Sequence, residues 1–431
     1  MTGKLTALLG SVTIAGLLAA GLLTTTTITA SAATATGAPG PARGIATTPA
    51  AAIKPAVLTD PAALMNPAGQ LSPAGTGVRP NTALDGVSCT SRTQCMAVGS
   101  HGGRVAADYA PLAEQWNGSR WRVLRVPGPV RLPRTELIAV SCRSSRYCVA
   151  AGYHYDASGS GEAVLAELWN GHRWRIIQSG FPVANTASFL NDVSCSGPAD
   201  CLAVGSYTNR SGTAHALAER WTGQRWRVQP VAGPRGARAA ELDGISCSRG
   251  GCVAVGLSQD RQGRALALAV RWRGATWRLL NPRNVAGASL SVLQDVSCRS
   301  TSVCMAVGYS DTAAVRPLTE RYSGGSWRLV ADHSLADAAL AGVSCTASRC
   351  VAVGSNGSQS LGEAWTGGAW RVLRTPWAGG PPASTLNQVS CLAQRCIAVG
   401  DRYHPGWSTG NATLAEIWTG RGWRVLATGN P

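Results

Sequence analysis

Eight residues combine side chains that can stack on a sugar or peptide with side chains that can form hydrogen bonds. All follow an A-V-G or A-A-G segment, and none belongs to the pattern that the rest of the chain repeats. Aromatic and polar groups that gather on a rigid scaffold typically recognise ligands. The residues expected to bind a ligand are His101, Tyr153, His154, Tyr155, Arg402, Tyr403, His404 and Trp407.

Four aspartates offer a second kind of chemistry, the acid–base hydrolysis of glycosides. Asp85, Asp192, Asp243 and Asp295 each follow a recurring leucine, and they occur in four of the seven internal repeats of the chain. Glycosidases normally use two carboxylates about 5–10 Å apart. Because the aspartates are irregular among the repeats, they provide the asymmetry that an enzyme site requires.

Motifs of the common catalytic and cofactor-binding classes do not occur in the sequence. We find no H-E-x-x-H, no nucleophile elbow and no phosphate-binding loop. The sequence therefore predicts no catalytic residue, no cofactor and no metal site.

One pattern, repeated seven times, occupies the chain from residue 84 onward. Each copy has L-x-x-[VI]-S-C, a second cysteine with x-A-[VA]-G, and a loose form of L-A-E-x-W-x-G-x-x-W-R. First cysteines of successive copies are 53, 53, 52, 51, 47 and 46 residues apart. A period near 50 with four short apolar runs is typical of a propeller blade. The copies begin at Leu84, Leu137, Leu190, Leu242, Leu293, Leu340 and Leu386.

The predicted fold is all-β, a seven-bladed β-propeller of four-stranded blades. No segment shows the sustained apolar period of a helix. A closed ring also removes the exposed sheet edges of an open β-array. The glycine between the third and fourth strands, as in Asn117-Gly118, favours a tight hairpin turn. Each blade is made of consecutive sequence, so blade 7 must pack on blade 1.

The fourteen cysteines are expected to form one disulfide within each repeat. Opposed residues of a hairpin lie about 4.5–5.5 Å apart at Cα, a distance that suits a disulfide. Zinc is the competing interpretation, but a lone cysteine pair offers two of the four ligands that zinc requires. The pairs are Cys89–Cys95, Cys142–Cys148, Cys195–Cys201, Cys247–Cys252, Cys298–Cys304, Cys345–Cys350 and Cys391–Cys396.

The order of these landmarks resembles the kelch repeats of galactose-oxidase-type propellers. Ala97-Val98-Gly99, Trp116 and Trp121 occupy the kelch positions, and the match recurs over residues 84–428. The kelch glycine doublet is mostly a single glycine here, and the paired cysteines are not a kelch feature. The G-x-x-W turn also looks like half of the Asp-box hairpin of sialidase-type propellers. The resemblance implies the fold and carries little information about function.

Three polar residue types recur with the repeat, so we expect them to have structural roles. The serine of V-S-C should be a structural hydroxyl, and the glutamate of L-A-E-x-W should be a blade–blade or cross-strand partner. The arginine after the second tryptophan should point outward from the outermost strand, where a charge discourages edge-to-edge aggregation. These arginines account for seven of the 17 net positive charges, which argues against nucleic acid as a partner.

Strand alternation assigns the loops of each repeat to two faces of the disc. The cysteine hairpins and x-G turns share one face, where every turn is short. The loops after A-V-G share the other, the variable-loop face, where lengths differ among repeats. Variable loops on a rigid ring are the usual place for binding. Because the ring closes, the loops of repeats 7, 1 and 2 should adjoin.

The N-terminal segment predicts export. Lys4, an uncharged stretch over 5–23 and Ala30-Ser31-Ala32 form a signal peptide over 1–32. An uncleaved membrane anchor remains the alternative, because the stretch is about long enough to span a bilayer. Residues 33–83 read as an Ala-, Pro- and Thr-rich leader before the propeller at 84–431. Paired cysteines fit an oxidising compartment, so we expect a secreted, extracellular or wall-associated protein.

These patterns favour a secreted, non-enzymatic binding or scaffold propeller. Its expected ligand is an extracellular glycan, an anionic wall polymer or a protein. The alternative is an extracellular carbohydrate-active hydrolase or lyase, with its site at the mouth of the central channel. Convergence of two carboxylates in that channel would distinguish the enzyme from the binding protein.

Overall fold

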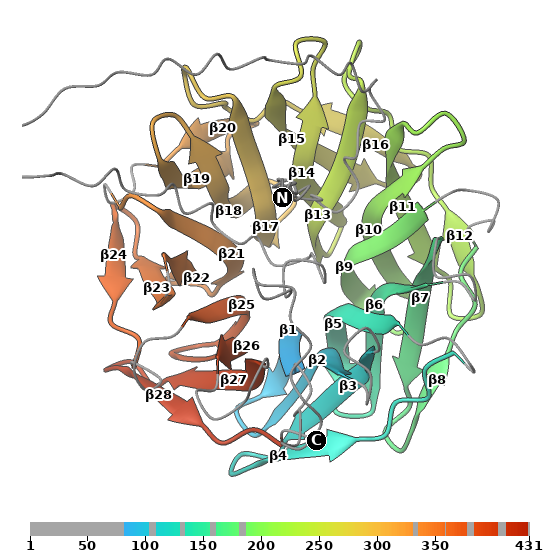
Figure 1. Cartoon of the computed structure of the whole chain (residues 1–431), viewed down its shortest axis with the longest axis vertical. Helices are drawn as coiled ribbons and strands as arrows, with labels where there is room; N and C mark the ends of the chain where they lie inside the picture. Colours follow the sequence, from blue (N-terminus) through green and yellow to red (C-terminus); the bar gives the residue numbers. More distant parts are fainter. Residues whose placement is uncertain are drawn as a thin grey trace, which may run out of the picture.

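The computed structural model describes residues 82–102, 109–129, 134–155, 161–180, 187–330, 335–357, 359–376, 383–403 and 411–429. These ranges contain 28 strands and no helix, and the strands surround a central channel as a ring (Figure 1). The predicted signal segment and all but the end of the predicted leader lie outside the described residues.

Each sequence repeat forms four consecutive strands, and the first of the four lies nearest the channel (Figure 1). The first strands are β1 (Thr82–Ser91), β5 (Thr135–Ser144), β9 (Ala187–Gly197), β13 (Ala239–Ser248), β17 (Leu290–Ser300), β21 (Ala338–Cys345) and β25 (Ser384–Leu392). The second strands are β2 (Gln94–Gly102), β6 (Tyr147–Tyr155), β10 (Asp200–Thr208), β14 (Gly251–Gln259), β18 (Val303–Asp311), β22 (Cys350–Asn356) and β26 (Arg395–Tyr403).

The two outer strands of each repeat join through the x-G turn. The third strands are β3 (Tyr109–Trp116), β7 (Glu162–Trp169), β11 (Ala214–Trp221), β15 (Ala265–Arg273), β19 (Val315–Ser323), β23 (Gln359–Trp365) and β27 (Asn411–Trp418). The outermost strands are β4 (Trp121–Leu124), β8 (Trp174–Ile176), β12 (Trp226–Val228), β16 (Thr276–Leu280), β20 (Ser326–Leu329), β24 (Trp370–Leu373) and β28 (Trp423–Leu426). Gly118 in the first turn has a φ of 98°, as expected of a hairpin glycine.

Hydrogen bonding divides the strands into five sheets, of four, eight, eight, four and four strands. Each eight-stranded sheet contains two repeats, which one parallel residue pair joins: Glu162 with Ala187, and Ala265 with Leu290. This differs from the expectation that every repeat forms a separate sheet. The joining pairs arise because the third strand of one repeat and the first strand of the next begin side by side on the variable-loop face.

All fourteen cysteines form disulfides within their own repeats, and no cysteine is free. Each bridge closes the hairpin between the first and second strands, where the two cysteines are cross-strand partners with Cα atoms 3.9–4.1 Å apart. The prediction of one disulfide per repeat is confirmed.

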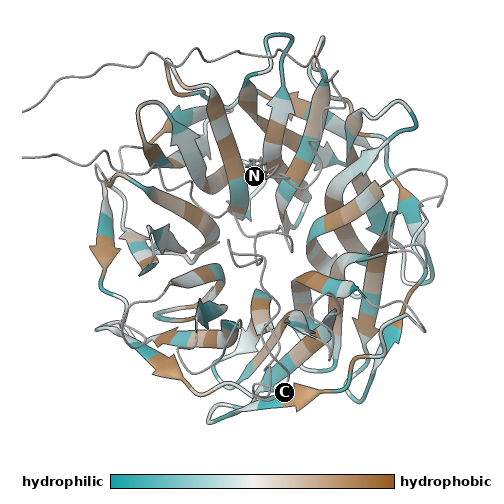
Figure 2. Cartoon of the chain, in the orientation of Figure 1, coloured by the Kyte–Doolittle hydropathy of each residue, from teal (hydrophilic) through white to brown (hydrophobic). Residues whose placement is uncertain are grey.

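The hydrophobic core lies between neighbouring repeats. In one cluster, Leu84 and Trp116 of repeat 1 pack with Ile397 and Val399 of repeat 7. Figure 2 shows hydrophobic residues along the strands and hydrophilic residues at many of the turns. Because each sheet buries both faces against its neighbours, no repeat has a complete core alone. Closing the ring therefore buries the faces of the first and last repeats as well.

A belt of serine hydroxyls links all the repeats in sequence. The hydroxyl of each V-S-C serine accepts a hydrogen bond of 2.9–3.0 Å from the backbone N–H of the first cysteine in the next repeat. The prediction of a structural hydroxyl is confirmed. The pairs are Ser88–Cys142, Ser141–Cys195, Ser194–Cys247, Ser246–Cys298, Ser297–Cys345, Ser344–Cys391 and Ser390–Cys89.

The recurring glutamates are fully buried and contact the end of the preceding repeat. Glu114 accepts a 2.9 Å hydrogen bond from the backbone N–H of Gly429, and so links repeats 1 and 7. Glu320 accepts a 2.8 Å bond from the backbone N–H of Arg283. For these glutamates, the predicted partnership between repeats is confirmed.

The outermost strands alternate as predicted. Their tryptophans are buried, and the arginine that follows each of them is exposed. The arginines are Arg122, Arg175, Arg227, Arg278, Arg328, Arg371 and Arg424. Within the described ranges, the structure has no helix with the length and apolar character of a membrane span.

Candidate binding site

The sequence-predicted binding residues lie at the ends of the second strands rather than in loops. Tyr153, His154 and Tyr155 end β6, and Arg402 and Tyr403 end β26. These strands continue for three residues beyond the A-A-G or A-V-G glycine. Alternation therefore governs these side chains, and neighbouring residues point to opposite faces of the sheet.

Of the three remaining predicted residues, one lies within the described ranges and two do not. His101 lies near the end of β2, is half-buried and pairs across the hairpin with Thr82. His404 and Trp407 lie outside the described residues. The predicted residues that the structure describes therefore lie at strand ends on the variable-loop face.

Tyr153 is the most buried of the predicted residues, with 5% of its surface exposed. Its ring packs edge-on against Phe189 and Tyr155, with centroids 5.1 and 6.1 Å away. Its hydroxyl donates a 2.7 Å hydrogen bond to Oε2 of Glu136. Tyr153 therefore contributes a buried ring and an anchored hydroxyl instead of an open stacking surface.

Glu136 is the centre of a polar cluster that sequence reasoning did not single out. Besides the bond from Tyr153, its Oε1 accepts a 3.1 Å bond from the hydroxyl of Ser100 in repeat 1. Asp85, also in repeat 1, accepts a 3.1 Å bond from the side-chain amide of Asn387 in repeat 7. Side chains of repeats 7, 1 and 2 thus meet at one point beside the channel.

Asp401 completes this cluster, and we call Asp85, Glu136 and Asp401 the acidic junction. The side-chain amide of Asn411 donates a 2.7 Å hydrogen bond to Asp401, which is 5% exposed. Asp401 and Glu136 both lie close enough to Asp85 for their charges to act on it. The junction joins the second strand of repeat 7 to the first strands of repeats 1 and 2.

Burial dominates the electrostatics of the acidic junction. It raises the pKa of Asp85 well above its usual range, and the charges of Glu136 and Asp401 raise it further. Burial also raises the pKa of Glu136, although hydrogen bonds from Tyr153 and Ser100 oppose the effect. The pKa of Asp401 is raised to about 7. The raised pKa values mean that the junction retains protons at neutral pH.

Tyr155 and Tyr403 are the predicted aromatic residues with accessible surface. The guanidinium of Arg134 lies 5.2 Å from the centroid of the half-buried Tyr155 ring, a cation–π distance. Burial raises the pKa of the Tyr155 hydroxyl, and the nearby Glu162 raises it further. Tyr403 is 39% exposed. Among the described residues of the sequence prediction, these are the two aromatic rings that an external ligand can contact.

The central channel contains a cavity of about 180 Å³. All four sequence-predicted aspartates line the cavity, together with Glu241 and several asparagine and glutamine side chains. The expectation that the aspartates reach the channel is confirmed. The residues that line it include Asp85, Asn191, Asp192, Glu241, Asp243, Asp295, Asn387 and Gln388.

The four aspartates hold two different register positions, because each L-x-x-V segment contains a β-bulge. Asp85 and Asp243 are the bulged residues, which have no cross-strand partner. Asp192 and Asp295 occupy the next position and pair with valines of the second strand. Bulges redirect side chains, so residues that look equivalent in the sequence have different environments.

Asp192 and Asp295 tie neighbouring repeats together through the backbone. Asp192 accepts 2.7 Å bonds from the N–H groups of Val193 and, in the next repeat, Ile245. Asp295 accepts bonds of 2.6 and 2.7 Å from Val296 and Val343 in the same arrangement. Each oxygen of the two carboxylates therefore accepts a backbone hydrogen bond, and the carboxylates stabilise the contact between neighbouring repeats.

Glycine at the same position of other repeats lets the strands approach closely. A Cβ on Gly244 would lie 2.7 Å from the Cα of Asp295, and one on Gly342 would lie 2.6 Å from Oε1 of Gln388. No side chain fits at such distances. The channel wall thus places a glycine of one repeat against a larger residue of the next.

A second carboxylate pair lies on the opposite side of the channel, on β13. Asn191 donates a 2.8 Å hydrogen bond to Glu241 and a 3.5 Å bond to Asp243. Burial raises the pKa of Glu241 well above its usual range, and that of Asp243 to about 8. One signal in the sequence marks Glu136 and Glu241 alike: in two repeats alone, a glutamate precedes the recurring leucine.

Metal-binding geometry does not occur in the part of the chain that the structure describes. No group of three or more His, Cys, Asp or Glu side chains there is arranged to hold an ion. The chemistry available at the site is therefore hydrogen bonding, stacking and proton retention by buried carboxyls.

Comparison with known proteins supports the fold. No family model and no curated protein matches the chain. The β-propeller domain of the Trilobed protease from Pyrococcus furiosus matches with a TM-score of 0.50 at 8% identity, over 82% of this chain and 97% of that one. The chain is therefore an all-β protein with a β-propeller fold.

Other similar solved structures have different activities. An ulvan lyase, a polysaccharide lyase, matches with a TM-score of 0.49 at 8% identity, over 82% of this chain and 97% of that one. The Aleuria aurantia lectin in complex with alpha-methyl-L-fucoside matches with a TM-score of 0.41 at 13% identity, over 70% of this chain and 97% of that one. A fold does not by itself define a function, so function has to be argued from the site.

Proposed function

We propose that this protein is a secreted, non-enzymatic binding propeller whose ligand contacts the variable-loop face where repeats 7, 1 and 2 meet. The ligand is an extracellular glycan, wall polymer or protein. We also propose that the seven repeats are seven blades of a kelch-like ring, which the cyclic serine belt supports. Seven disulfides fit an extracellular location.

The acidic junction is the observation that carries the proposal. It unites three repeats at the channel mouth through Asp85, Glu136 and Asp401, side chains that the repeat pattern does not require. Tyr155 with Arg134, and Tyr403, stand at the ends of the second strands of repeats 2 and 7, on either side of repeat 1, and present accessible rings. Rings beside fixed polar groups suit a sugar or a peptide.

Two properties of the channel favour binding over catalysis: the hydrogen bonding of its aspartates and the small volume of its cavity. Asp192 and Asp295 each accept two backbone hydrogen bonds, one on each oxygen, so their side chains are held in structural contacts between repeats. The cavity of about 180 Å³ is smaller than the roughly 300–1,000 Å³ of typical small-molecule sites. We therefore infer that ligands contact the face and do not enter the channel.

The enzyme alternative depends on Glu241 and Asp243. Burial raises the pKa values of both carboxyls, that of Asp243 to about 8, and a raised pKa suits a general acid. A polysaccharide hydrolase or lyase would lose its activity in Asp243→Asn. Release of reducing ends or unsaturated sugars from a polysaccharide panel, lost in that variant, would replace the binding proposal.

The test is a glycan and wall-polymer array probed with the purified mature protein. Tyr155→Ala/Tyr403→Ala should lose the signal at least tenfold. The matched control is Gln259→Ala, because Gln259 holds the same position in β14 that the two tyrosines hold in β6 and β26. Equal loss in both variants, or no loss in either, would contradict the proposed face.

A further inference from the structure

Three cross-strand pairs of arginines lie on the two outer strands of repeats 3, 4 and 5. The pairs are Arg220 with Arg227, Arg271 with Arg278 and Arg321 with Arg328. Like charges directly opposite one another destabilise an antiparallel pair. A cost that recurs in three successive repeats requires an explanation beyond folding.

The other repeats show that folding does not need the second arginine. Each has the outward arginine of its outermost strand, but the residue opposite is uncharged. Those residues are Gln115, Leu168, Ala364 and Ile417. Protection of the sheet edge accounts for the recurring arginine, whereas the added one is confined to a single arc of the ring.

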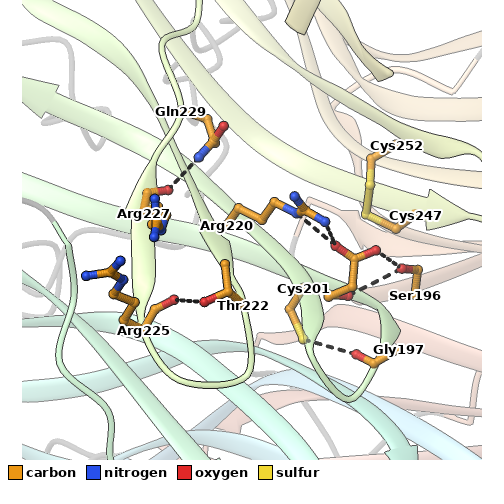
Figure 3. Close-up of polar contacts among 11 residues, drawn as sticks. Ser196, Gly197, Cys201, Arg220, Thr222, Arg225, Arg227, Gln229, Cys247 and Cys252 are labelled. Carbon is orange, nitrogen blue, oxygen red and sulfur yellow. Dashed lines mark hydrogen bonds and ion pairs between the residues drawn. A yellow bond between two sulfur atoms is a disulfide. The ribbon is translucent and has the colours of Figure 1, made fainter. Parts of the chain in front are cut away.

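Each arginine pair faces the gap between its repeat and the next. Arg271 is the cross-strand partner of Val253 and lies on the same face of the sheet. The side chain of Val253 packs in the core shared with repeat 5. Arg321 lies over the Trp365 ring of repeat 6, with its Cζ 5.5 Å from the centroid. Figure 3 shows the first pair, Arg220 and Arg227, near the disulfide hairpins. The pairs therefore follow one another along the cysteine-hairpin side.

Protein carboxylates neutralise little of this charge. Asp200 forms a 2.9 Å ion pair with Arg220. In the described ranges the one other ion pair, Arg264 with Asp260, lies in the turn between β14 and β15, on the variable-loop face. The neighbouring glutamates, such as Glu320 beside Arg321, are fully buried and turned to the other side of the sheet.

We propose that this arc, the arginine arc (Arg220, Arg227, Arg271, Arg278, Arg321 and Arg328), binds an anionic polysaccharide. Guanidinium groups bind sulfate and carboxylate groups through paired hydrogen bonds. An anion between two opposed arginines also removes their repulsion. The arc is separate from the face proposed for ligand binding, and its test does not depend on that proposal.

The curvature of the rim selects a flexible chain over nucleic acid. A straight DNA duplex can contact a convex rim only at the gap between one pair of neighbouring repeats. Bending the duplex to reach the other arginine pairs costs free energy. Single-stranded nucleic acid binds through exposed aromatic rings on which its bases stack. The aromatic ring beside the arc, Trp365, is half-buried beneath Arg321, and the exposed Tyr403 lies on the variable-loop face. An extended polysaccharide needs neither feature.

Heparin is the probe for the mature full-length protein, with neutral dextran as the control ligand. The variant Arg271→Gln/Arg278→Gln/Arg321→Gln/Arg328→Gln removes four charges from the arc. The matched variant Arg122→Gln/Arg175→Gln/Arg371→Gln/Arg424→Gln removes four from the remaining rim. We expect the Kd for heparin to rise at least tenfold in the first variant and less than twofold in the second. The salt dependence of binding should also weaken in the first.

Three outcomes would overturn the proposal. Equal losses in the two variants would mean that net charge alone attracts heparin. Absence of heparin binding by the unmodified protein would exclude a sulfated chain as the partner. Binding of a DNA duplex as tightly as heparin would replace the polysaccharide by nucleic acid. Circular dichroism and the thermal midpoint confirm that each variant is folded, and Tyr155→Ala/Tyr403→Ala should leave heparin binding unchanged.

Discussion

The hydroxyl of Ser390, in the last repeat, accepts a 3.0 Å hydrogen bond from the backbone N–H of Cys89, in the first. The same bond joins every other pair of neighbouring repeats, from Ser88 with Cys142 onward. The contact between the two ends of the repeat array is therefore equivalent to each internal contact.

Loss of one belt serine should cost the same at the closure as inside the ring. Ser390→Ala leaves the N–H of Cys89 without its acceptor, as Ser194→Ala does for Cys247. We expect each to lower the free energy of unfolding by about 1–3 kcal/mol. Urea denaturation of both variants measures the values. A much smaller cost for Ser390→Ala would show that the ring stays open there.

Non-reducing peptide mapping should find seven bridges, each within one repeat, and no free thiol. Removing one bridge, as in Cys247→Ser/Cys252→Ser, should cost about 2 kcal/mol, because the closed loop is short and its chain entropy small. Any bridge between different repeats would contradict the assignment of the hairpins.

Stability should fall as the pH rises from about 4.5 to about 8. Burial raises the pKa of Glu167 to about 8 from a usual value of 4.5, although a bond from the backbone of Gly128 opposes the shift. In that range the folded protein holds a proton that the unfolded chain releases, so the free energy of unfolding decreases with pH.

Glu167→Gln tests this assignment by keeping an acceptor and removing the charge. The variant should match the original protein at pH 4.5 and be more stable by about 1–3 kcal/mol at pH 8, since a buried charge with few partners is costly. Thermal unfolding at both pH values measures the difference. The same gain at both would rule out titration of Glu167 as its cause.

Tyr155→Ala/Tyr403→Ala should leave the free energy of unfolding within about 1 kcal/mol, as is usual for accessible positions at strand ends. Tyr153→Phe should be more destabilising, because it removes the 2.7 Å bond to the buried Glu136. Denaturant titrations compare the two. The reverse order would mean that Tyr155 and Tyr403 are structural and that the proposed face is misplaced.

Deletion of residues 33–75 should leave the thermal midpoint nearly unchanged, because that segment has few large apolar side chains to bury. Differential scanning calorimetry of the truncated protein makes the comparison. A drop of more than a few degrees would show that the leader packs on the disc.

Residues that recur with the repeat could be predicted from the sequence. Periodicity identified Ser390 and Glu114 as structural, because a side chain that occurs in nearly every repeat is not a unique catalytic residue. The short spacing within each hairpin allowed the cysteines to be paired. The acidic junction could not be predicted in this way. Asp85 lies in a bulge and Asp192 one position beyond it, and the sequence does not reveal which way a bulged side chain turns.

The channel wall has a consequence for the symmetry of the ring. After the bulged position, repeats 3, 5 and 7 have Asp192, Asp295 and Gln388, whereas repeats 4 and 6 have glycine. Large and small residues cannot alternate perfectly around an odd number of units, so one seam must join two of a kind. It falls between Gly86 and Ala139, where a Cβ on Gly86 would lie 2.8 Å from the Cα of Ala139. Asp85 and Glu136 meet at this same seam. The acidic junction therefore lies where the alternation of large and small residues around the seven repeats is interrupted.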